Sequence, residues 1–174
     1  DMDGLMVDTE SLSTKALISS AKKQDYEMTK EETLQVLGFT EAAIYKFWEN
    51  YFEDSHVDGK KLADDHYDYI EEVLFTTGPD KMPNVEELLV YLKENNYKVA
   101  VASSSNIDHI ENNMEKTRLR KYIDKIASGQ EVSNGKPAPD VFLLAAERLG
   151  VKPENCLVLE DSKSGIKAGC ASGA

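Results

Sequence analysis

Two acidic residues at the start of the chain have a spacing that suits metal binding or proton transfer. Asp1 and Asp3 stand at positions i and i+2 of the sequence Asp-Met-Asp-Gly, and in extended backbone such residues project to the same side. An EF-hand calcium loop does not fit, because that loop needs its glycine at the sixth position and Gly4 is the fourth residue. An exposed acidic turn, in which Gly4 supplies a permissive dihedral angle, is the alternative interpretation.

A second acidic pair, Glu160 and Asp161, directly follows the apolar run 156–159. A short apolar run of this kind is typical of a buried strand, so we expect both acids at the mouth of that strand. The alternative is an N-cap formed by Asp161 or Ser162, since Asp and Ser commonly open the helix that follows a strand.

Polar residues follow other expected strands in the same way. Ser103 and Ser104 come after the run 98–102, and a serine hydroxyl with the following backbone amides can hold an anion at a helix N-terminus. Lys136 stands between Gly135 and a proline-containing segment, where prolines fix the backbone before a helix. A plain polar turn and a solvent-facing lysine are the alternative interpretations.

Alternating helices and strands must position these side chains. The apolar pattern predicts strands at 98–102, 123–127 and 156–159, and helices at 107–116 and 140–149. A further helix is expected after Asn84, a candidate N-cap with Glu87 three residues later. Such alternation forms parallel βαβ units, and the loops at the carboxyl ends of parallel strands meet in one crevice. The sequence therefore predicts an α/β fold.

Residues 9–82 have a different pattern, in which apolar residues recur at helical spacing without a strand-like alternation. The aromatic stripe that includes Trp48 and Phe52 is expected in the core of a helical bundle rather than around a ligand. The segment 77–83 is rich in Gly and Pro, which is typical of a hinge. We interpret 9–82 as a bundle domain inserted into a core made of residues 1–8 and 83–174.

Composition argues against several classes of protein. Lys and Arg number 20 against 32 Asp and Glu, a net charge of −12, which repels the phosphate backbone of nucleic acids. No run approaches the roughly 18 apolar residues of a membrane span.

Cys156 and Cys170 match neither a disulfide framework nor a zinc site, so we expect buried thiols in a cytoplasmic protein. His56, His66 and His109 lack partners at metal spacing and are expected on the surface or in packing.

In chain order the four polar segments read Asp-x-Asp-Gly, Ser, Lys and Glu-Asp. This series resembles the motifs of the haloacid dehalogenase-like phosphohydrolase superfamily, and residues 1–10 resemble the first motif of its sugar-phosphate branch. The helical insert is similar to the cap domain of the β-phosphoglucomutase-like members. The resemblance spans essentially the whole chain. It implies a Rossmann-like core with a parallel sheet and an inserted α-helical cap domain.

The resemblance also implies an activity, the hydrolysis of a small phosphorylated metabolite. Asp1 would be the nucleophile that forms an aspartyl-phosphate, and Asp3 would protonate the leaving alcohol and then deprotonate the attacking water. Ser103 and Ser104 would bind the phosphoryl group, and Lys136 would neutralise its developing charge.

A divalent metal ion is expected in the same crevice. The carboxylates of Asp1, Asp3, Glu160 and Asp161 cannot all stay ionised there with one lysine as their counter-charge. Oxygen ligands and a phosphate substrate favour Mg²⁺. The resemblance places Asp1, the backbone carbonyl of Asp3 and Asp161 on the metal, with Glu160 close by or reaching it through water.

Two alternatives to hydrolysis remain open. A sugar-phosphate mutase of the β-phosphoglucomutase type shares the pair Asp8-Thr9, but where it carries a histidine and a phosphate-binding arginine this chain has Ser13 and the segment Gly38-Phe39-Thr40-Glu41. The far phosphate of a bisphosphate intermediate would then lack its main partner, so we favour hydrolysis. A catalytically idle phosphate-sensing or scaffolding relative is the other alternative, and the intact motif set argues against it.

The family places a buried apolar strand before its first aspartate, whereas this sequence begins at Asp1. A parallel sheet without its central strand leaves unpaired backbone edges. We therefore expect this chain to be part of a longer one, with a further strand after Ala174, and we expect Asp1 to lie close to Asp161.

Overall fold

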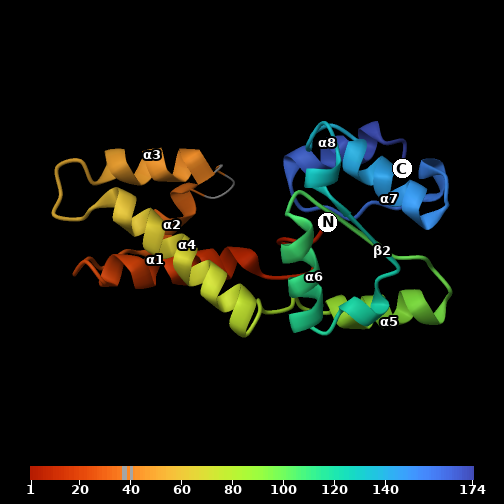
Figure 1. Cartoon of the computed structure of the whole chain (residues 1–174), viewed down its shortest axis with the longest axis horizontal. Coiled ribbons are helices and arrows are strands. Elements are labelled where there is room, and N and C mark those ends of the chain that lie inside the picture. Colours follow the sequence, from red (N-terminus) through yellow and green to blue (C-terminus); the bar gives the residue numbers. More distant parts are fainter. Residues whose placement is uncertain (37–38, 40) are drawn as a thin grey trace. The chain divides into compact units, whose positions relative to one another are not determined.

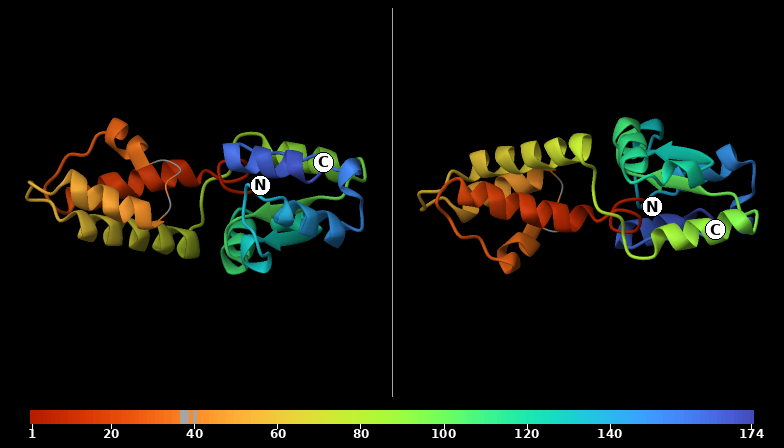
Figure 2. Two further views of the ribbon diagram at one scale, coloured as in Figure 1. Left: turned by 90° about the horizontal axis from the view of Figure 1, so that it is seen from above. Right: turned by 90° about the horizontal axis from the view of Figure 1, so that it is seen from below.

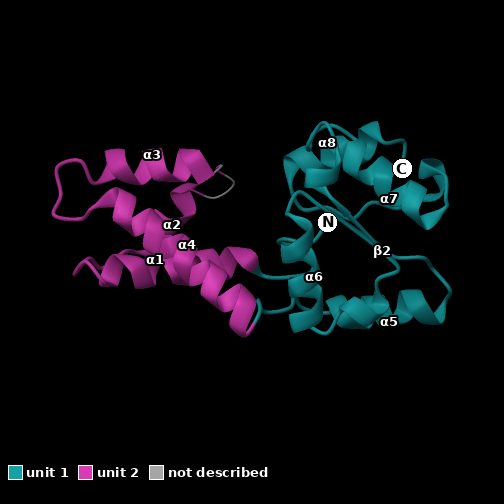
Figure 3. Cartoon of the chain, in the orientation of Figure 1, with its two compact units in different colours: residues 1–8, 78–174 teal, residues 9–77 magenta. Residues whose placement is uncertain are grey.

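A computed structural model of the chain describes residues 1–36, 39 and 41–174. The chain forms two compact units, shown in two colours in Figure 3. Unit 1 comprises residues 1–8 and 78–174, and unit 2 comprises residues 9–77. The assignment of these parts as a catalytic core and a cap domain, with a boundary between residues 82 and 83, remains a prediction.

Unit 1 is built around a parallel βαβ element. Strand β1 (Ala100–Ser103) pairs in parallel with β2 (Lys125–Ser128), and Val101 lies opposite Ile126. Helix α6 (Ile107–Lys116) belongs to the connection between them. This arrangement confirms the predicted α/β class with a parallel sheet, and α6 has the bounds that the apolar pattern indicated.

Alternate residues of the two strands face different helices, as the two-residue period of a strand requires. Val101 and Ile126 belong to a core cluster that contains residues of α5 (Val85–Glu94) and α6. Ala102 and Ala127 belong to a second cluster with residues of α7 (Asp140–Leu149) and α8 (Lys163–Ala171). In Figure 1 the sheet accordingly lies between α5 and α6 on one side and α7 and α8 on the other.

Asn84 takes the predicted N-cap position of α5, but its side chain does not cap the helix. Asn84 directly precedes α5, but its φ is 62° and its side chain makes no capping hydrogen bond. An N-cap side chain reaches the first backbone amides of a helix from extended backbone, and the left-handed conformation of Asn84 does not provide that approach.

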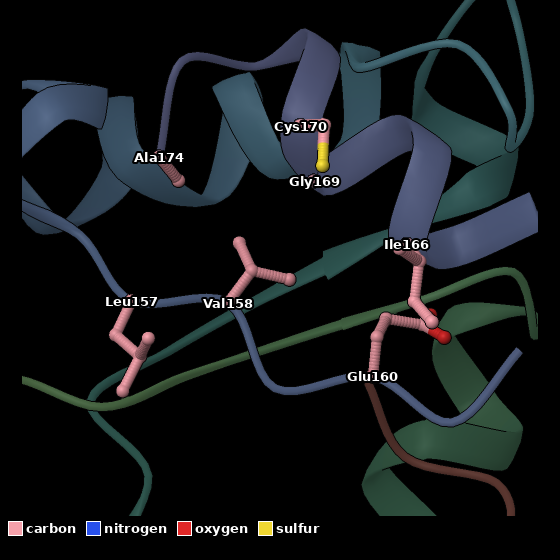
Figure 4. A pocket seen from close by; sticks show the side chains of 7 residues that line it. All are labelled: Leu157, Val158, Glu160, Ile166, Gly169, Cys170 and Ala174. Carbon is pink, nitrogen blue, oxygen red and sulfur yellow. The ribbon is translucent and has the colours of Figure 1, made fainter. Parts of the chain in front are cut away.

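The predicted strand 156–159 is not paired as a strand within the described part of the chain. Its side chains still alternate: Val158 points toward Gly169 on α8, whereas Leu157 points away and is 84% exposed (Figure 4). The backbone nitrogen of Asp1 donates to the Leu159 carbonyl at 3.0 Å. A strand needs a ladder of backbone hydrogen bonds to a neighbour, and no described segment provides one here.

The first eight residues are part of unit 1. Met2 and Val7 are fully buried, and Val7 forms an antiparallel bridge with Lys81. Two backbone hydrogen bonds of 2.9 Å join the same segments, one on either side of that bridge. Residues 6–8 and 80–82 therefore run side by side.

Unit 2 is a helical bundle, as the sequence predicted. Its α-helices are α1 (Thr9–Lys22), α2 (Lys30–Thr33), α3 (Glu41–Tyr51) and α4 (Gly59–Thr76). Helices α1 and α4 run side by side in opposite directions (Figure 2). Trp48 is fully buried and Phe52 is 4% exposed in the core of the bundle, which confirms the structural interpretation of these two aromatic residues.

The expectation of two buried thiols is wrong, since Cys170 is exposed and Cys156 is only half-buried. His66 is buried, in agreement with a packing role. Among the described residues no helix combines the length and the apolar character needed to span a bilayer.

Candidate active site

Lys136 joins two of the predicted acidic residues. Its Nζ atom donates to Oδ1 of Asp1 at 2.7 Å and to Oε1 of Glu160, and its side chain is only 6% exposed. The same Nζ atom lies 4.9 Å from the centre of the Phe142 ring, whose face attracts a cation. The alternative of a solvent-facing lysine is therefore wrong.

Glu160 is fully engaged by its neighbours. Its Oε2 atom accepts hydrogen bonds of 2.9 Å from both the backbone amide and the hydroxyl of Ser162. Burial raises the pKa of Glu160, but the hydrogen bonds from Lys136 and Ser162 outweigh it and hold the pKa below its ordinary value. The carboxylate is thus ionised where it meets the lysine.

Ser162 also forms the N-cap of α8, because its hydroxyl accepts a hydrogen bond from the amide of Gly165. The sequence left open whether Asp161 or Ser162 would take this role. Since Ser162 does, both Glu160 and Asp161 remain available to the site.

Three carboxylates meet at a position that suits a metal ion. Asp1, Glu160 and Asp161 each offer one oxygen atom, and these three atoms lie within 4.8 Å of one another. Mg²⁺ binds oxygen at about 2.1 Å, so ligands on opposite sides of the ion are about 4.2 Å apart. The ammonium group of Lys136 balances one of the three negative charges, and a divalent cation would balance the other two. The donor set therefore fits Mg²⁺, and Asp1 lies close to Asp161 as expected.

The carboxylate of Asp3 lies against residues 103–105 at the end of β1, which we call the serine loop. Its Oδ2 atom accepts a hydrogen bond from Ser105 at 2.9 Å and a longer one from Ser103 at 3.5 Å. Ser103 is 1% exposed, and Ser104 is exposed. The metal contact through the Asp3 backbone carbonyl and the phosphate-binding roles of both serines remain predictions.

Two glycines that sequence reasoning did not assign to the site make room for its carboxylates. A Cβ atom on Gly4 would lie 2.1 Å from Oδ2 of Asp161, and one on Gly165 would lie 1.9 Å from Oε1 of Glu160. From the sequence, Gly4 was considered only as a residue that supplies a permissive dihedral angle in a turn, and its φ is +72°. No local pattern indicates that the Asp161 carboxylate fills the space beside Gly4, or that the Glu160 carboxylate fills the space beside Gly165.

Ser105 and Phe142 are the other residues that the sequence did not single out. Ser105 is one of three consecutive serines, and residue types alone do not say which hydroxyl faces Asp3. Phe142 occupies an apolar position of a helix, which is typical of a core residue, and it is 7% exposed. Its contact with Lys136 depends on tertiary structure.

Ser13 and the segment 38–41, where the sequence differs from the mutase pattern, both belong to residues 9–77. The hydroxyl of Ser13 is 2.9 Å from Nε2 of His66. Gly38 and Thr40 lie outside the described residues, whereas Phe39 is exposed and Glu41 begins α3.

The family model described as haloacid dehalogenase-like hydrolase matches residues 1–174. The chain is 32% identical over 183 residues to a phosphorylated carbohydrates phosphatase of Thermotoga maritima, with 99% of this chain and 79% of that protein aligned. It is 35% identical over 191 residues to a provisionally assigned pseudouridine-5'-phosphatase of Drosophila melanogaster, with 99% and 76% aligned.

A similar fold is found among solved structures. A crystal structure from Thermotoga maritima that carries a provisional β-phosphoglucomutase assignment superimposes with a TM-score of 0.85 at 31% identity. The match covers 99% of this chain and 79% of the other.

Proposed function

This chain belongs to the haloacid dehalogenase-like hydrolase family, and from that premise we propose that it is a Mg²⁺-dependent phosphatase of small phosphomonoesters, sugar phosphates above all. The observation that carries the proposal is the buried ion pair of Lys136 with Asp1 and Glu160, next to Asp161. Relatives that act on phosphorylated carbohydrates support the substrate class.

The first chemical step is transfer of the phosphoryl group to Asp1. Lys136 holds Oδ1 of this carboxylate, which orients Oδ2 for attack on phosphorus. As the new bond from Oδ2 to phosphorus forms, the bond from phosphorus to the leaving oxygen breaks, and its electron pair stays on that oxygen. Asp3 donates a proton there, so the product leaves as a neutral alcohol.

The second step regenerates the enzyme. Asp3, now a carboxylate, takes a proton from a water molecule while the water oxygen attacks phosphorus. The bond from Oδ2 of Asp1 to phosphorus breaks, and inorganic phosphate is released. Asp3 is thereby returned to its protonated state for the next cycle.

Charge stabilisation comes from the groups that surround the nucleophile. Lys136 would neutralise the charge that develops on the phosphoryl oxygens, and the hydroxyl of Ser103 and the Ser104 segment would hold the same group. Asp1, the backbone carbonyl of Asp3 and Asp161 would hold Mg²⁺, with Glu160 beside them. When bound, Mg²⁺ would supply positive charge to the phosphoryl oxygens and let the carboxylates of Asp1, Glu160 and Asp161 stay ionised.

Hydrolysis is favoured over isomerisation by the composition of unit 2. The mutase resemblance calls for a phosphate-binding arginine, whose planar fork holds the second phosphate of the intermediate with two hydrogen bonds. The arginines of this chain, Arg118, Arg120 and Arg148, all lie outside residues 9–77. At the position of the mutase histidine this chain has Ser13, whose hydroxyl forms a hydrogen bond with Nε2 of His66.

A cytoplasmic location and a small phosphorylated metabolite as partner complete the proposal. Cys156 and Cys170 are free thiols, as is usual in a reducing compartment. The net charge of −12 disfavours nucleic acid as a partner.

The test is an assay of phosphate release and sugar isomerisation. The protein is incubated with Mg²⁺ and a panel of sugar phosphates, nucleotides and β-glucose 1-phosphate, next to an Asp1→Asn variant. We expect inorganic phosphate from sugar phosphates, lost in Asp1→Asn and on chelation, and restored by added Mg²⁺. Isomerised sugar without net phosphate release would establish the mutase instead, and the absence of both products would revive the alternative of a non-catalytic relative.

A further inference from the structure

Ser105 is held by three hydrogen bonds, of which one reaches the proposed proton donor. Its hydroxyl donates to Oδ2 of Asp3 at 2.9 Å, and its amide donates to the Ser103 hydroxyl at 3.1 Å. Its carbonyl accepts from the hydroxyl of Ser128 at 2.7 Å. Backbone and side chain of Ser105 are therefore both fixed in place.

Ser128, the last residue of β2, gives this loop a rigid support. It is 0% exposed, and its own hydroxyl and amide are engaged by Gln130 and Glu131 in a capping arrangement. A Cβ atom on the next residue, Gly129, would lie 3.0 Å from both Cα and O of Ser104. Gly129, which follows the last residue of β2, therefore packs directly against the backbone of Ser104. A side chain at position 129 would be in tight contact with that backbone.

The two serines that contact Asp3 are not equivalent. Ser103 is 3.5 Å from Oδ2, the limit of a hydrogen bond, and it accepts the Ser105 amide. Ser105 makes the short bond to Asp3 and has no role in the proposed binding of phosphate. A hydrogen bond to Oδ2 leaves Oδ1 of Asp3 as the oxygen that carries the transferable proton.

We propose that Ser105 is a positioning residue for the reaction, which holds the Asp3 carboxylate so that its free oxygen faces the leaving group, and that Ser128 holds Ser105. This inference rests on the proposed phosphatase function. The short Asp side chain can rotate about two bonds, and proton transfer needs its oxygen within about 3 Å of the leaving oxygen. Loss of the Ser105 hydroxyl would release that rotation without removing the acid.

Two esters with different leaving groups test this role. Glucose 6-phosphate needs a proton on its departing alkoxide, whereas the p-nitrophenolate of p-nitrophenyl phosphate departs unprotonated. In the Ser105→Ala protein we expect kcat/KM for glucose 6-phosphate to fall about 10- to 100-fold, the lower range of general acid catalysis, and kcat/KM for p-nitrophenyl phosphate to change less than about 3-fold. Because kcat/KM reports the steps up to the first phosphoryl transfer, later hydrolysis of the intermediate does not blur the comparison.

Further variants separate the role of the hydroxyl from a general loss of structure. Ser105→Thr keeps the hydroxyl and should restore the wild-type ratio of kcat/KM for glucose 6-phosphate to kcat/KM for p-nitrophenyl phosphate. Ser128→Ala should lower this ratio by a smaller factor than Ser105→Ala does. Ser55→Ala, a change at an exposed serine of unit 2, is the matched control and should leave both values unchanged.

The outcomes are distinguishable from failure of the proposed function. If the wild-type protein hydrolyses neither ester and no other phosphomonoester of the panel, the phosphatase proposal fails. If it hydrolyses both, and Ser105→Ala lowers the two kcat/KM values equally or not at all, the positioning role is overturned while the phosphatase proposal stands. A Ser105→Thr protein with the selectivity of Ser105→Ala would overturn it as well.

Discussion

Gly4 has no side chain at the point to which Asp161 directs its carboxylate: a Cβ atom on Gly4 would lie 2.1 Å from Oδ2 of Asp161. Two segments from opposite ends of the chain are thereby in direct contact. The turn that begins at Asp1 and the segment that ends at Asp161 must fit closely before the acidic side chains can face one another.

Replacing Gly4 by alanine should therefore damage the metal site. Its φ of +72° is unfavourable for alanine, which costs about 1 kcal/mol of folding stability, and the added methyl group must displace Asp161. We expect the Mg²⁺ concentration for half-maximal activity to rise at least about 10-fold, since a lost ligand weakens metal binding by roughly that factor or more.

Gly150→Ala is the matched control for this prediction. Gly150 has a φ of +64°, and a methyl group added there would have no neighbour within 4 Å among the described residues. The two variants should lose similar stability in thermal unfolding, but only Gly4→Ala should need more Mg²⁺. Equal Mg²⁺ dependence in both would contradict the steric explanation.

Gly165→Ala tests the space beside Glu160. On helix propensity alone, alanine within α8 should stabilise the protein by up to about 1 kcal/mol. However, its Cβ atom would lie 1.9 Å from Oε1 of Glu160, so we expect the carboxylate to be displaced and kcat to fall at least about 10-fold, as for a lost electrostatic partner. Gly169→Ala in the same helix meets Val158 at 3.1 Å and should retain kcat.

Lys136→Met should reduce both activity and stability. Removing one partner of a buried ion pair costs about 3–5 kcal/mol, because the carboxylates of Asp1 and Glu160 stay buried without their ammonium group. We expect kcat to fall at least about 100-fold. Added Mg²⁺ should raise the melting temperature of this variant more than that of the wild type, since a cation can replace the lost positive charge.

A surface lysine provides the control for Lys136→Met. Lys167 lies in α8 and is exposed, so Lys167→Met should match the wild type in kcat and melting temperature. Equal stabilisation of the wild type and of Lys136→Met by Mg²⁺ would argue against a shared site for the lysine and the metal.

His66 should make the stability of unit 2 depend on pH. Burial lowers the pKa of His66 from 6.5 to about 4. The unfolded chain therefore binds a proton on this residue between pH 6.5 and about 4 while the folded chain does not, so stability is lost as the pH falls through that range. A shift of this size corresponds to about 3 kcal/mol.

Urea unfolding followed by Trp48 fluorescence measures this effect, because Trp48 is the single tryptophan and is buried in unit 2. The His66→Gln protein should lose much less stability between pH 7 and pH 4.5 than the wild type does. His56→Gln, at an exposed histidine of the same unit, should keep the wild-type dependence. An unchanged pH dependence in His66→Gln would refute the assignment.

Those parts of the fold that depend on local pattern could be predicted from the sequence. Helices α6 and α7 have the predicted bounds, because their apolar faces and end signals are contained in the segments themselves. Asn84 shows the limit of such signals: its residue type suits an N-cap, but the backbone that enters α5 is left-handed. The run 156–159 has the apolar character of a strand, yet pairing depends on a neighbour that no local pattern specifies.

The residue types of the candidate site could also be predicted, but not their contacts. The order of motifs brought Asp1, Lys136 and Glu160 together as candidates, and the structure joins them through hydrogen bonds. Which of three adjacent serine hydroxyls faces Asp3 depends on dihedral angles that the residue types leave free. The same holds for Gly4 and Gly165, whose missing side chains matter only because the carboxylates of Asp161 and Glu160 fill the space.

The bridge between Val7 and Lys81 has a consequence for how the chain could be rebuilt. Residues 6–8 and 80–82 lie side by side, and the amide of Asp8 donates to the carbonyl of Asp80 at 2.9 Å. The two points where unit 2 leaves and rejoins unit 1 are thus already neighbours, so a short turn could close the gap in its place. Unit 2 is, in this sense, an exchangeable module: one bundle can be swapped for another in protein engineering while the hydrogen bonds at its base stay intact.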